Sequence, residues 1–524
     1  MASSRAVDVF ERSVDRVSEF ANTRMGWRVI VCALLLAACG ATTWYVSADI
    51  DLFTRVATGR LIAQLGEVPL SDPWAYTPRK GTWHEHELIP CVLFYLFSQH
   101  GGDTALFALK LAFAVATLML VFLAQRSAGN ATATGLALIA LALPDMLSVW
   151  LPTVRAQVIT YICFAFFLFA FVRARFQGDR CWLLLLPFYE VLWVNSHGGF
   201  IVGIIFSTVF TLQMLIEGKR SRLMIISWVG VLLAPLANMY GWSFLFFIFG
   251  AVTNLPTEIN EWFALRPWTG HGVLVYGITA IVALGLSAWR RIPREGIVFI
   301  GLSALEGFRH ERLSPLYTIA LSVYGVPLFA EGLLRIRTYW PGFWPILRRS
   351  FVASCVLLTA VCGVRLLYVA PQLAKGFQLD YSDYPVAAID WLRESRPGGT
   401  IMTHYNEGSY TLWRIGSQFR ISLDGRYDGV YPPETIRMGL EAYEGPTPAQ
   451  RAALKSFNPD YVLLSPSTPG LCDDQVALRE AMYPGYTLAF SDKRFCILER
   501  GERASGGPVV TSYPQKIPIW APLW

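Results

Sequence analysis

The chain has 524 residues, of which 54% are hydrophobic and 16% are charged, and its formal net charge is +6. Soluble globular proteins carry roughly a quarter charged residues, so this composition excludes a soluble enzyme and predicts a protein with many membrane spans. The positive charge does not indicate nucleic-acid binding, because the basic residues lie in short loops between apolar runs.

The apolar runs predict a polytopic α-helical membrane protein with about eleven transmembrane helices. Residues 1–28 carry five arginines and are expected to form a cytoplasmic N-terminal segment. Residues 29–370 then form the transmembrane domain, in which 88–100 is too short to span and is expected to be an interfacial or re-entrant helix. The predicted spans are 29–48, 104–124, 131–147, 156–172, 182–194, 199–216, 223–238, 272–289, 295–306, 313–332 and 350–370.

The distribution of Lys and Arg predicts which loops face the cytoplasm. A cytoplasmic N-terminus puts most of the basic loop residues on the cytoplasmic side, as the positive-inside rule requires. The first loop, 49–103, then lies outside, and an odd number of spans places the C-terminal part in the periplasm of a bacterial inner membrane. The motifs WHEHE (83–87), NSHGG (195–199) and FRHER (308–312) all fall on this outer side. The residues capable of chemistry are therefore expected on one membrane face.

Beyond the last span, charged residues, prolines and glycines return, which predicts a C-terminal soluble α/β domain over residues 371–500. The tail, 501–524, has too little hydrophobic periodicity for a core and is expected to be extended or docked on this domain. Cys472 and Cys496 either form a disulfide in an oxidising compartment or stay reduced. Helix-like stretches at 383–395, 433–445 and 447–458 alternate with strand-like stretches at 400–405, 419–424, 461–465, 486–490 and 495–499.

Two carboxylates follow the first predicted span directly. Asp49 and Asp51 stand in the string WYVSADIDLF, at the expected membrane boundary. Carboxylates at a half-buried site that water can reach suit a general base, or ligands for a hard cation such as Mg²⁺ or Mn²⁺. If this segment is extended, both side chains point to one side. The alternative interpretation is that the two acids only mark the water interface.

The WHEHE string is a second candidate. His84 and His86, with Glu85 and Glu87, offer metal-ligand chemistry, but a zinc site needs three or four ligands and a spacing of two residues in a turn supplies two. A polar rim before the next helix is the preferred interpretation. It leaves His84 and Glu85 as candidates for substrate contact.

Two outer loops between spans hold further candidates. Asn195 and His197 precede two glycines, and they either form a tight turn or contact substrate. Arg309 and Arg312 lie outside, against the positive-inside trend, so they need a reason to be there. Binding a lipid phosphate is one, since a guanidinium pairs bidentately with phosphate. The alternative is an ion pair with a glutamate of the same segment.

Together these features resemble the C-type membrane glycosyltransferases (GT-C), and most closely bacterial members with a periplasmic C-terminal domain. The shared order is a first span, Asp-Ile-Asp at its exit, a loop with W-x-x-HE, further helices and a soluble C-terminal domain. The strings that carry the resemblance are DIDLFTRVATGRLI (49–62), VPLSDPWAYT (68–77), WVNSHGGF (193–200), the turn NMYG (238–241), INEW (259–262) and SLDGRYD (422–428).

The resemblance implies roles for several residues. In this superfamily an acid of the first loop binds a metal or acts as a base, which nominates Asp49 and Asp51. The donor is usually a polyprenyl-phosphate sugar. Residues 405–426 also look like the acceptor-engaging region of oligosaccharyltransferases, although Trp-Trp-Asp is missing there. The acceptor is therefore left open as a glycan, a lipid or a protein, with Asp424 and Arg426 as further binding candidates.

The expected reaction is inverting sugar transfer. Lipid phosphate leaves without protonation, so one carboxylate base suffices, unlike the carboxyl pair of glycosidases. One alternative is a non-catalytic transporter or flippase of lipid-linked sugar, or a scaffold of an envelope polysaccharide pathway. Few mid-span charges (Lys110 and Glu190) and no inverted repeat argue against transport. Another alternative, resting on WHEHE alone, is a metalloenzyme that hydrolyses lipid phosphates.

Overall fold

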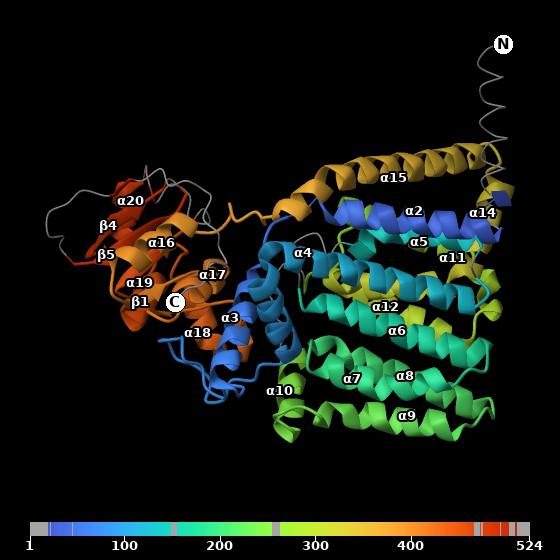
Figure 1. Cartoon of the computed structure of the whole chain (residues 1–524), viewed down its shortest axis with the longest axis horizontal. Coiled ribbons are helices and arrows are strands. Elements are labelled where there is room, and N and C mark those ends of the chain that lie inside the picture. Colours follow the sequence, from blue (N-terminus) through green and yellow to red (C-terminus); the bar gives the residue numbers. More distant parts are fainter. Residues whose placement is uncertain are drawn as a thin grey trace, which may run out of the picture. The chain divides into compact units, whose positions relative to one another are not determined.

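The structure is a computed structural model that divides into two compact units (Figure 1). The helical unit contains Met1–Val46 and Phe107–Phe377, and the mixed unit contains Ser47–Leu106 and Gln378–Trp524. The part of the predicted cytoplasmic segment before residue 19, residues 259–261 of INEW and most of the tail 501–524 lie outside the described residues. The described residues are 19–20, 23–44, 46–130, 132–147, 155–253, 262–465, 472, 475–492, 494–501 and 509–510.

The helical unit consists of apolar helices that run roughly side by side (Figure 1). In its described part, five helices are long and apolar enough to cross a membrane. A sixth span is added if Glu311–Tyr324, which comprises η6 (Glu311–Leu313) and α13, forms one span with α14 despite the bend of 82° between them. The predicted total of about eleven spans stays a prediction. The helices are α2 (Arg24–Thr42), α4 (Leu88–Ser127), α5 (Ala133–Leu147), α6 (Gln157–Phe176), α7 (Leu186–Val194), α8 (Ile201–Ile216), α9 (Arg222–Leu233), α10 (Trp242–Thr253), α11 (Gly270–Leu284), α12 (Arg294–Arg309), α13 (Ser314–Tyr324), α14 (Val326–Tyr339) and α15 (Trp344–Lys375).

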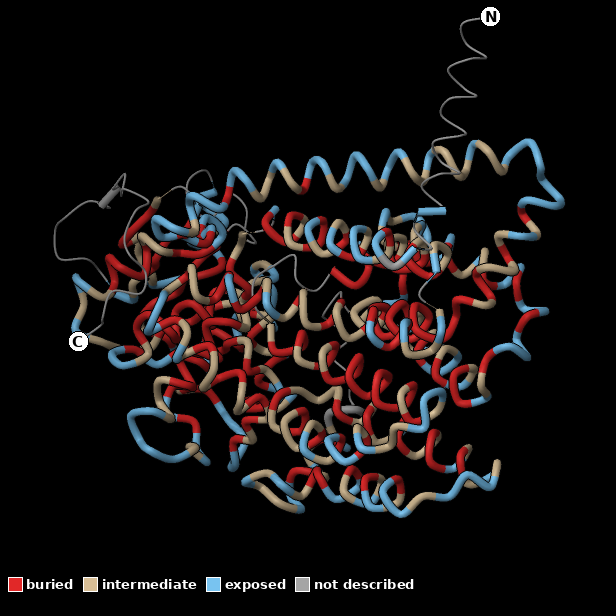
Figure 2. The backbone as a smooth tube through the Cα atoms, turned by 45° about the vertical axis from the view of Figure 1, so that its right-hand side comes forward, coloured by how far each residue is buried: buried red, intermediate tan, exposed pale blue. Residues whose placement is uncertain are grey.

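The helices of this unit differ widely in burial. In the apolar window of α6, 83% of the residues are buried inside the protein, whereas α15 buries only 11% of its window (Figure 2). Stacked rings fill the interior, such as Phe206 on Phe299 with centroids 4.3 Å apart. Since a mostly exposed apolar helix is stable in lipid, this pattern fits a membrane protein whose outer helices face the bilayer.

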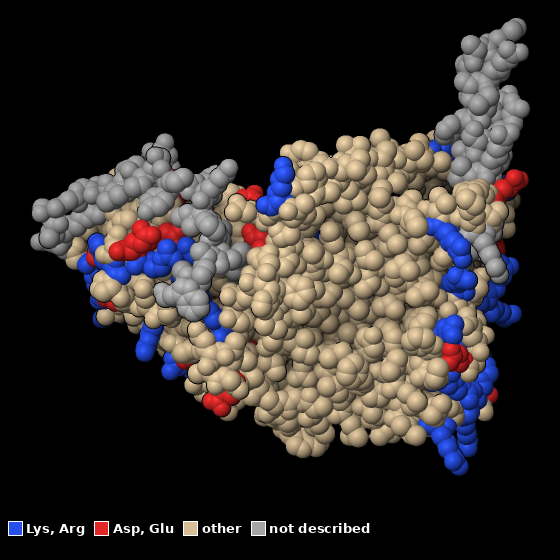
Figure 3. Space-filling view, in the orientation of Figure 1, with Lys and Arg blue, Asp and Glu red and all other residues tan. Residues whose placement is uncertain are grey.

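Charged side chains gather at one end of the helical unit. Figure 3 shows Lys and Arg there, beside a broad uncharged surface. Arg173 and Arg175 lie in the last turn of α6, and Arg175 pairs with Glu217, the residue that caps α8. The carboxylate of Glu217 also pairs with Lys219, 2.9 Å away. This asymmetry is the one from which the sequence predicts a cytoplasmic side.

The long helix α4 is broken at Gly102, whose φ of 55° and ψ of −144° are not helical. The break separates the predicted short helix 88–100 from the predicted span 104–124, and it lies close to the boundary between the two units. Lys110, on the second part of α4, donates to the carbonyl of Thr42 at 3.0 Å, and Arg365 of α15 donates to that of Thr43 at 3.0 Å. These cations satisfy the last carbonyls of α2, which explains a buried lysine between apolar helices.

A six-stranded sheet, ordered β2-β1-β3-β5-β4-β6, forms the centre of the mixed unit. Its first three strands are parallel, with Ile401 in register with both Ile421 and Tyr461, and β5 runs antiparallel to β3 and β4. All five predicted strands are present, and β6 was not predicted. The strands are β1 (Gly399–Met402), β2 (Phe419–Ile421), β3 (Tyr461–Leu464), β4 (Tyr486–Ser491), β5 (Cys496–Arg500) and β6 (Val509–Val510).

Helices cover the sheet, and the first loop of the chain joins it. The Thr447 side chain caps α19 by accepting from the Gln450 amide at 3.1 Å, as a Thr-Pro start predicts. Cys472 and Cys496 form a disulfide. At the β2 edge, the Ile421 amide donates to the carbonyl of Trp74 at 3.0 Å, so the compact unit includes the first loop as well as the predicted soluble domain. The helices are α3 (Ile50–Leu65), α16 (Val386–Ser395), α17 (Tyr405–Ile415), α18 (Pro433–Glu441), α19 (Pro448–Phe457) and α20 (Val476–Met482).

Candidate active site

Asp49 and Asp51 lie at the start of α3. Asp49 is the N-cap residue, and its Oδ1 accepts a hydrogen bond from the Asp51 amide at 3.0 Å. The expectation of an extended segment is therefore wrong, because the helix begins at Ile50, and Asp51 belongs to its first turn. Both carboxylates lie at the positive end of the helix dipole. Asp49 is 8% exposed, so its carboxylate is the more buried of the two.

A ring of aromatic side chains fixes the first turns of α3. Phe53 is fully buried, and its ring lies 4.7 Å from that of Tyr384, 5.2 Å from Tyr410, 5.4 Å from Trp413 and 6.1 Å from Tyr381. Such ring pairs add specific geometry to their buried area. Helix α17 and the segment before α16 thereby hold the helix start that carries the two aspartates.

Tyr384 ties this segment to the residue before Asp49. Its hydroxyl donates to the carbonyl of Ala48 at 2.9 Å. Burial, and then the negative charges of Asp49 and Asp51, raise the pKa of Tyr384 well above its ordinary value. The phenol therefore stays protonated and continues to donate.

The loop after β2 approaches Asp51 closely. A Cβ atom at Gly425 would lie 2.7 Å from the Ser409 hydroxyl and 3.3 Å from Oδ1 of Asp51. The Gly425 amide also donates to that hydroxyl at 3.0 Å. Since a side chain at this position has no room, the bare backbone of Gly425 forms one wall beside the Asp51 carboxylate.

Glu85 belongs to a buried ion cluster of the first loop. Arg55 of α3 donates to Glu85 at 3.0 Å, and its Nε lies 2.5 Å from a carboxylate oxygen of Glu87. Burial raises the pKa of Glu87, against the opposing charge of Arg55. Burial also lowers the pKa of His84, which is half-buried beside this cluster. The geometry gives Glu85 a structural partner and supports the interpretation of WHEHE as a polar rim.

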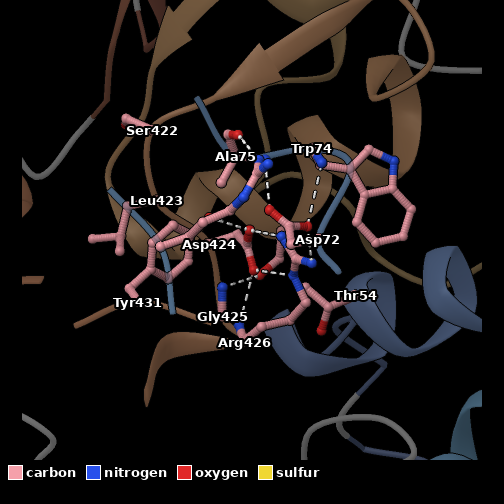
Figure 4. Close-up of polar contacts among 12 residues, drawn as sticks. Thr54, Asp72, Trp74, Ala75, Ser422, Leu423, Asp424, Gly425, Arg426 and Tyr431 are labelled. Carbon is pink, nitrogen blue, oxygen red and sulfur yellow. Dashed lines mark hydrogen bonds and ion pairs between the residues drawn. The ribbon is translucent and has the colours of Figure 1, made fainter. Parts of the chain in front are cut away.

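Asp424 and Arg426 form a second buried ion cluster (Figure 4). Arg426 donates to the two carboxylate oxygens of Asp424 at 2.9 and 2.7 Å, and it also donates to Asp72 of the first loop. The rings of Trp74 and Trp83 each lie 4.9 Å from the guanidinium. Burial opposes ionisation of Asp424, but Arg426 outweighs it and lowers the pKa of this carboxyl. Sequence reasoning had nominated this pair for substrate, whereas its burial and mutual pairing support a role in holding the loop after β2.

A third titratable pair follows the carboxyl end of β1. His404 caps α17 and accepts from the Asn406 amide at 3.4 Å, and Glu407 lies in the first turn of that helix. Oε2 of Glu407 is 3.7 Å from Nδ1 of His404. Burial raises the pKa of Glu407 to about 7 and lowers the pKa of His404 to about 4. Near neutral pH His404 is therefore uncharged and Glu407 titrates.

The residues expected to hold a metal do not come together in a complete site. Among the described residues, no three His, Cys, Asp or Glu side chains are grouped so that they could hold a metal ion. Asp49 and Asp51 lack a third ligand of this kind, and His84 and His86 do too. The ligand set of a zinc site is therefore not assembled in this part of the chain, whereas Mg²⁺ usually takes only one or two carboxylates together with water and phosphate oxygens.

In the helical unit, Asn195 and His197 shape a turn between α7 and α8. The Asn195 side chain donates to the carbonyls of Val191 and Ala237 at 2.9 and 3.0 Å. Nδ1 of His197 accepts from the Gly199 amide at 3.1 Å and lies 2.9 Å from the Thr160 hydroxyl. These contacts support the tight-turn interpretation for both residues.

Arg309 and Arg312 flank the junction of α12 and α13. Arg309 is exposed and lies 3.7 Å from Glu306, which is the ion pair expected as the alternative to phosphate binding. The Arg312 guanidinium lies 4.6 Å from the centre of the Trp262 ring and donates to the Gln157 side chain at 2.9 Å. The two arginines therefore occupy one short segment of the helical unit, at the end where α6 begins.

No protein-family profile matches this sequence, and no curated protein matches it significantly. Solved structures do. The apo oligosaccharyltransferase of Archaeoglobus fulgidus is similar with a TM-score of 0.56 at 10% identity, over 93% of this chain and 76% of that one. The archaeal oligosaccharyltransferase AglB from Archaeoglobus fulgidus, in complex with an inhibitory peptide and a dolichol-phosphate, is similar with a TM-score of 0.53 at 10% identity, over 92% and 75%. The chain has the GT-C fold.

ArnT from Cupriavidus metallidurans, bound to undecaprenyl phosphate, is a further GT-C structure with some likeness, at a TM-score of 0.49 and 11% identity over 91% of this chain and 98% of that one. The oligosaccharyltransferase structures confirm the resemblance drawn from the sequence strings at the level of the fold. At such low identity the likeness establishes the fold, and residue roles must be argued from the geometry.

Sequence reasoning missed a polar cluster within the helical unit of this GT-C fold. Asp145 of α5 is fully buried and contacts His271 of α11 together with Ser314 and Thr318 of α13. His271 also lies 3.1 Å from Glu311. Neither Asp145 nor His271 is among the candidate residues nominated from the sequence. No local motif reveals the pair, because 126 residues separate its members.

Proposed function

We propose that the protein is a membrane glycosyltransferase that transfers a sugar from a polyprenyl-phosphate lipid donor to an acceptor at the periplasmic face of the bacterial inner membrane. The observation that carries this proposal is the placement of Asp49 and Asp51 at the start of α3, with Oδ1 of Asp51 against the backbone of Gly425. The GT-C fold supports it, as does the dolichol-phosphate bound by the archaeal oligosaccharyltransferase.

Asp51 is the proposed general base, because it is less buried than Asp49. Its carboxylate takes the proton of the acceptor hydroxyl as the acceptor oxygen bonds to the anomeric carbon of the sugar. The bond between this carbon and the phosphate oxygen breaks, and the electron pair leaves with the lipid phosphate. A phosphate anion departs without protonation, so the reaction needs no acid partner.

Asp49 is the second proposed catalytic residue. Its carboxylate lies beside Asp51, where it can orient the acceptor hydroxyl, and it also fixes the first turn of α3. No step of this mechanism is routed through a metal.

The other candidates fall into two groups. Arg309 and Arg312 are proposed to bind the donor phosphate, where a guanidinium stabilises the charge that develops on the leaving group. The remaining residues, whose contacts within the chain are described above, are proposed to shape the walls of the sugar and acceptor pockets. They are His84, Glu85, Asn195, His197, Asp424 and Arg426. A glycan, a lipid or a protein hydroxyl satisfies the same chemistry, with membrane lipids as the surrounding partners.

The test is sugar transfer by purified protein in proteoliposomes, supplied with a panel of labelled undecaprenyl-phosphate hexoses. Asn caps a helix as well as Asp does, so Asp49→Asn keeps the start of α3 and removes only the carboxylate. We expect Asp49→Asn and Asp51→Asn each to lower turnover about 100-fold or more. Asp383→Asn, at an exposed carboxylate of the same unit, is the matched control and should retain activity.

Wild-type turnover in the Asp49→Asn, Asp51→Asn double variant would overturn the assignment of the base. The proposed sidedness has a separate test, which is labelling of cysteines introduced at exposed positions 71 and 428 with a membrane-impermeant reagent in whole cells. Labelling of both supports a periplasmic site, and protection of either contradicts it.

A further inference from the structure

The polar cluster around Asp145 lies in the helical unit. The Asp145 side chain is fully buried, and its oxygens contact His271, the Ser314 hydroxyl at 2.6 Å, and the Thr318 hydroxyl. A buried carboxylate is expensive unless it is hydrogen-bonded and paired. Side chains of α11 and α13 supply these contacts to the carboxylate on α5.

His271 bridges two carboxylates. Nε2 contacts Asp145, and Nδ1 lies 3.1 Å from Oε1 of Glu311. An imidazolium donates from both ring nitrogens, so this form of His271 can hydrogen-bond to both carboxylates at once. One ring therefore links α5, α11 and the short helix η6. Tyr161 of α6 and Tyr317 of α13 also lie near Asp145.

The bridge ends on the segment that carries the two arginines proposed to bind phosphate. Glu311 precedes Arg312, whose carbonyl accepts from the Gln157 side chain and from the Tyr161 hydroxyl, each at 3.0 Å. The Arg312 guanidinium lies over Trp262 and contacts Gln157 again. The backbone and side chain of Arg312 are thus held from α6, while the neighbouring residue is held by His271.

We propose that Asp145 and His271 are positioning residues of the lipid-phosphate site, which fix the segment 309–314 so that Arg312 presents its guanidinium to the phosphate of a polyprenyl-phosphate lipid. This inference rests on the proposed function, and it adds a residue pair that touches no substrate. It requires His271 to act through Arg312, and a residue that only stabilises the fold would have no such dependence.

The experiment measures binding of undecaprenyl phosphate to purified protein in detergent, for example by native mass spectrometry. Arg312→Gln should weaken binding tenfold or more, which is the loss usually seen when a charge-assisted hydrogen bond is removed. His271→Gln should weaken it about tenfold, since Gln cannot bridge both carboxylates. When His271→Gln is added to Arg312→Gln, the affinity should fall by less than about a further threefold, because the arginine that His271 positions is already absent.

Three controls make the outcome decisive. His100→Gln, at an exposed histidine, should bind like the wild type. Glu311→Gln removes the negative charge at the half-buried end of the bridge and should reproduce the effect of His271→Gln if the latter folds poorly. Asp51→Asn should bind the lipid normally, because it changes the chemical step alone.

The outcomes separate the two proposals. No binding of undecaprenyl phosphate by the wild-type protein contradicts the proposed function. Binding by the wild type that His271→Gln and Glu311→Gln leave unchanged overturns the positioning role alone. Full additivity of His271→Gln and Arg312→Gln also overturns it, since the histidine would then act independently of the arginine.

Discussion

Arg426 holds two loops of the mixed unit together, and its removal offers a sharp test of the structure. The Arg426→Gln variant leaves the carboxylates of Asp424 and Asp72 buried without their cation. It also removes the guanidinium that lies between Trp74 and Trp83. Both ion partners are at most 1% exposed at their side chains, so water cannot replace the lost charge without local unfolding.

The expected loss can be estimated from the burial of the pair. Removing one partner of a buried salt bridge costs about 3–5 kcal/mol, mostly because the other charge remains uncompensated. The cation–π contacts overlap with this term and are not added separately. Since each 1.36 kcal/mol is a factor of ten, the hydrogen-exchange protection factors of the core amides should fall by roughly two to four orders of magnitude.

Native-state hydrogen exchange of β2 and its neighbour β1, in detergent micelles, measures this change directly. Arg420→Gln is the matched control, because Arg420 points outward from β2 and is exposed. It should change exchange less than about tenfold. Neutralising both acids together with Arg426→Gln should recover part of the loss, since no buried charge is then left unpaired. Exchange in Arg426→Gln within tenfold of the wild type would refute this account of the cluster.

Three further changes have defined outcomes. In Glu407→Gln only His404 titrates, and because its pKa is lowered in the folded state, the free energy of unfolding should rise by roughly 3 kcal/mol from pH 4 to 6.5. In His404→Asn only Glu407 titrates, and because its pKa is raised in the folded state, the free energy of unfolding should fall by a similar amount from pH 4.5 to 7. In the wild type the two effects offset, so its free energy of unfolding should change little with pH. Thermal midpoints measured between pH 4 and 8 check this, and a midpoint that moves in the opposite direction in either variant would contradict it. Reducing the bond between Cys472 and Cys496, which closes a loop with a sequence separation of 24, should lower stability by about 3 kcal/mol, and an unchanged denaturation midpoint in Cys496→Ser would contradict this. Thr447→Ala should cost about 1 kcal/mol by removing the cap of α19, with faster amide exchange confined to that helix, and equal protection in both proteins would count against the cap.

Local patterns predicted the secondary structure of the mixed unit well. The five strand-like stretches all form strands, and Thr447 followed by proline marks the start of α19. Helix α17 was missed, because Gly408 and Ser409 weaken the helical pattern of its sequence. It is helical through tertiary contact, since its aromatic side chains surround Phe53 of α3. Propensity is a weak guide wherever such packing decides.

The candidate site shows a different limit of sequence reasoning. Asp49 and Asp51 could be nominated from the residues, but an extended segment and a helix start place the same two side chains differently. Their relation to Gly425 could not be predicted, because spacing along the chain says nothing about which distant loop meets a helix N-terminus. The same holds for His271 and Asp145, which meet only when α5 and α11 pack together.

The mixed unit is assembled from two stretches of chain that the ribosome makes at different times. Phe107–Phe377 separates them, and at about 5–20 residues per second its synthesis takes roughly 15 to 55 s. Throughout this delay Asp51 has emerged, but the loop that contains Gly425 does not yet exist. A prematurely terminated chain thus contains both aspartates without Gly425, so the candidate site is complete only after the loop that follows β2 has been translated.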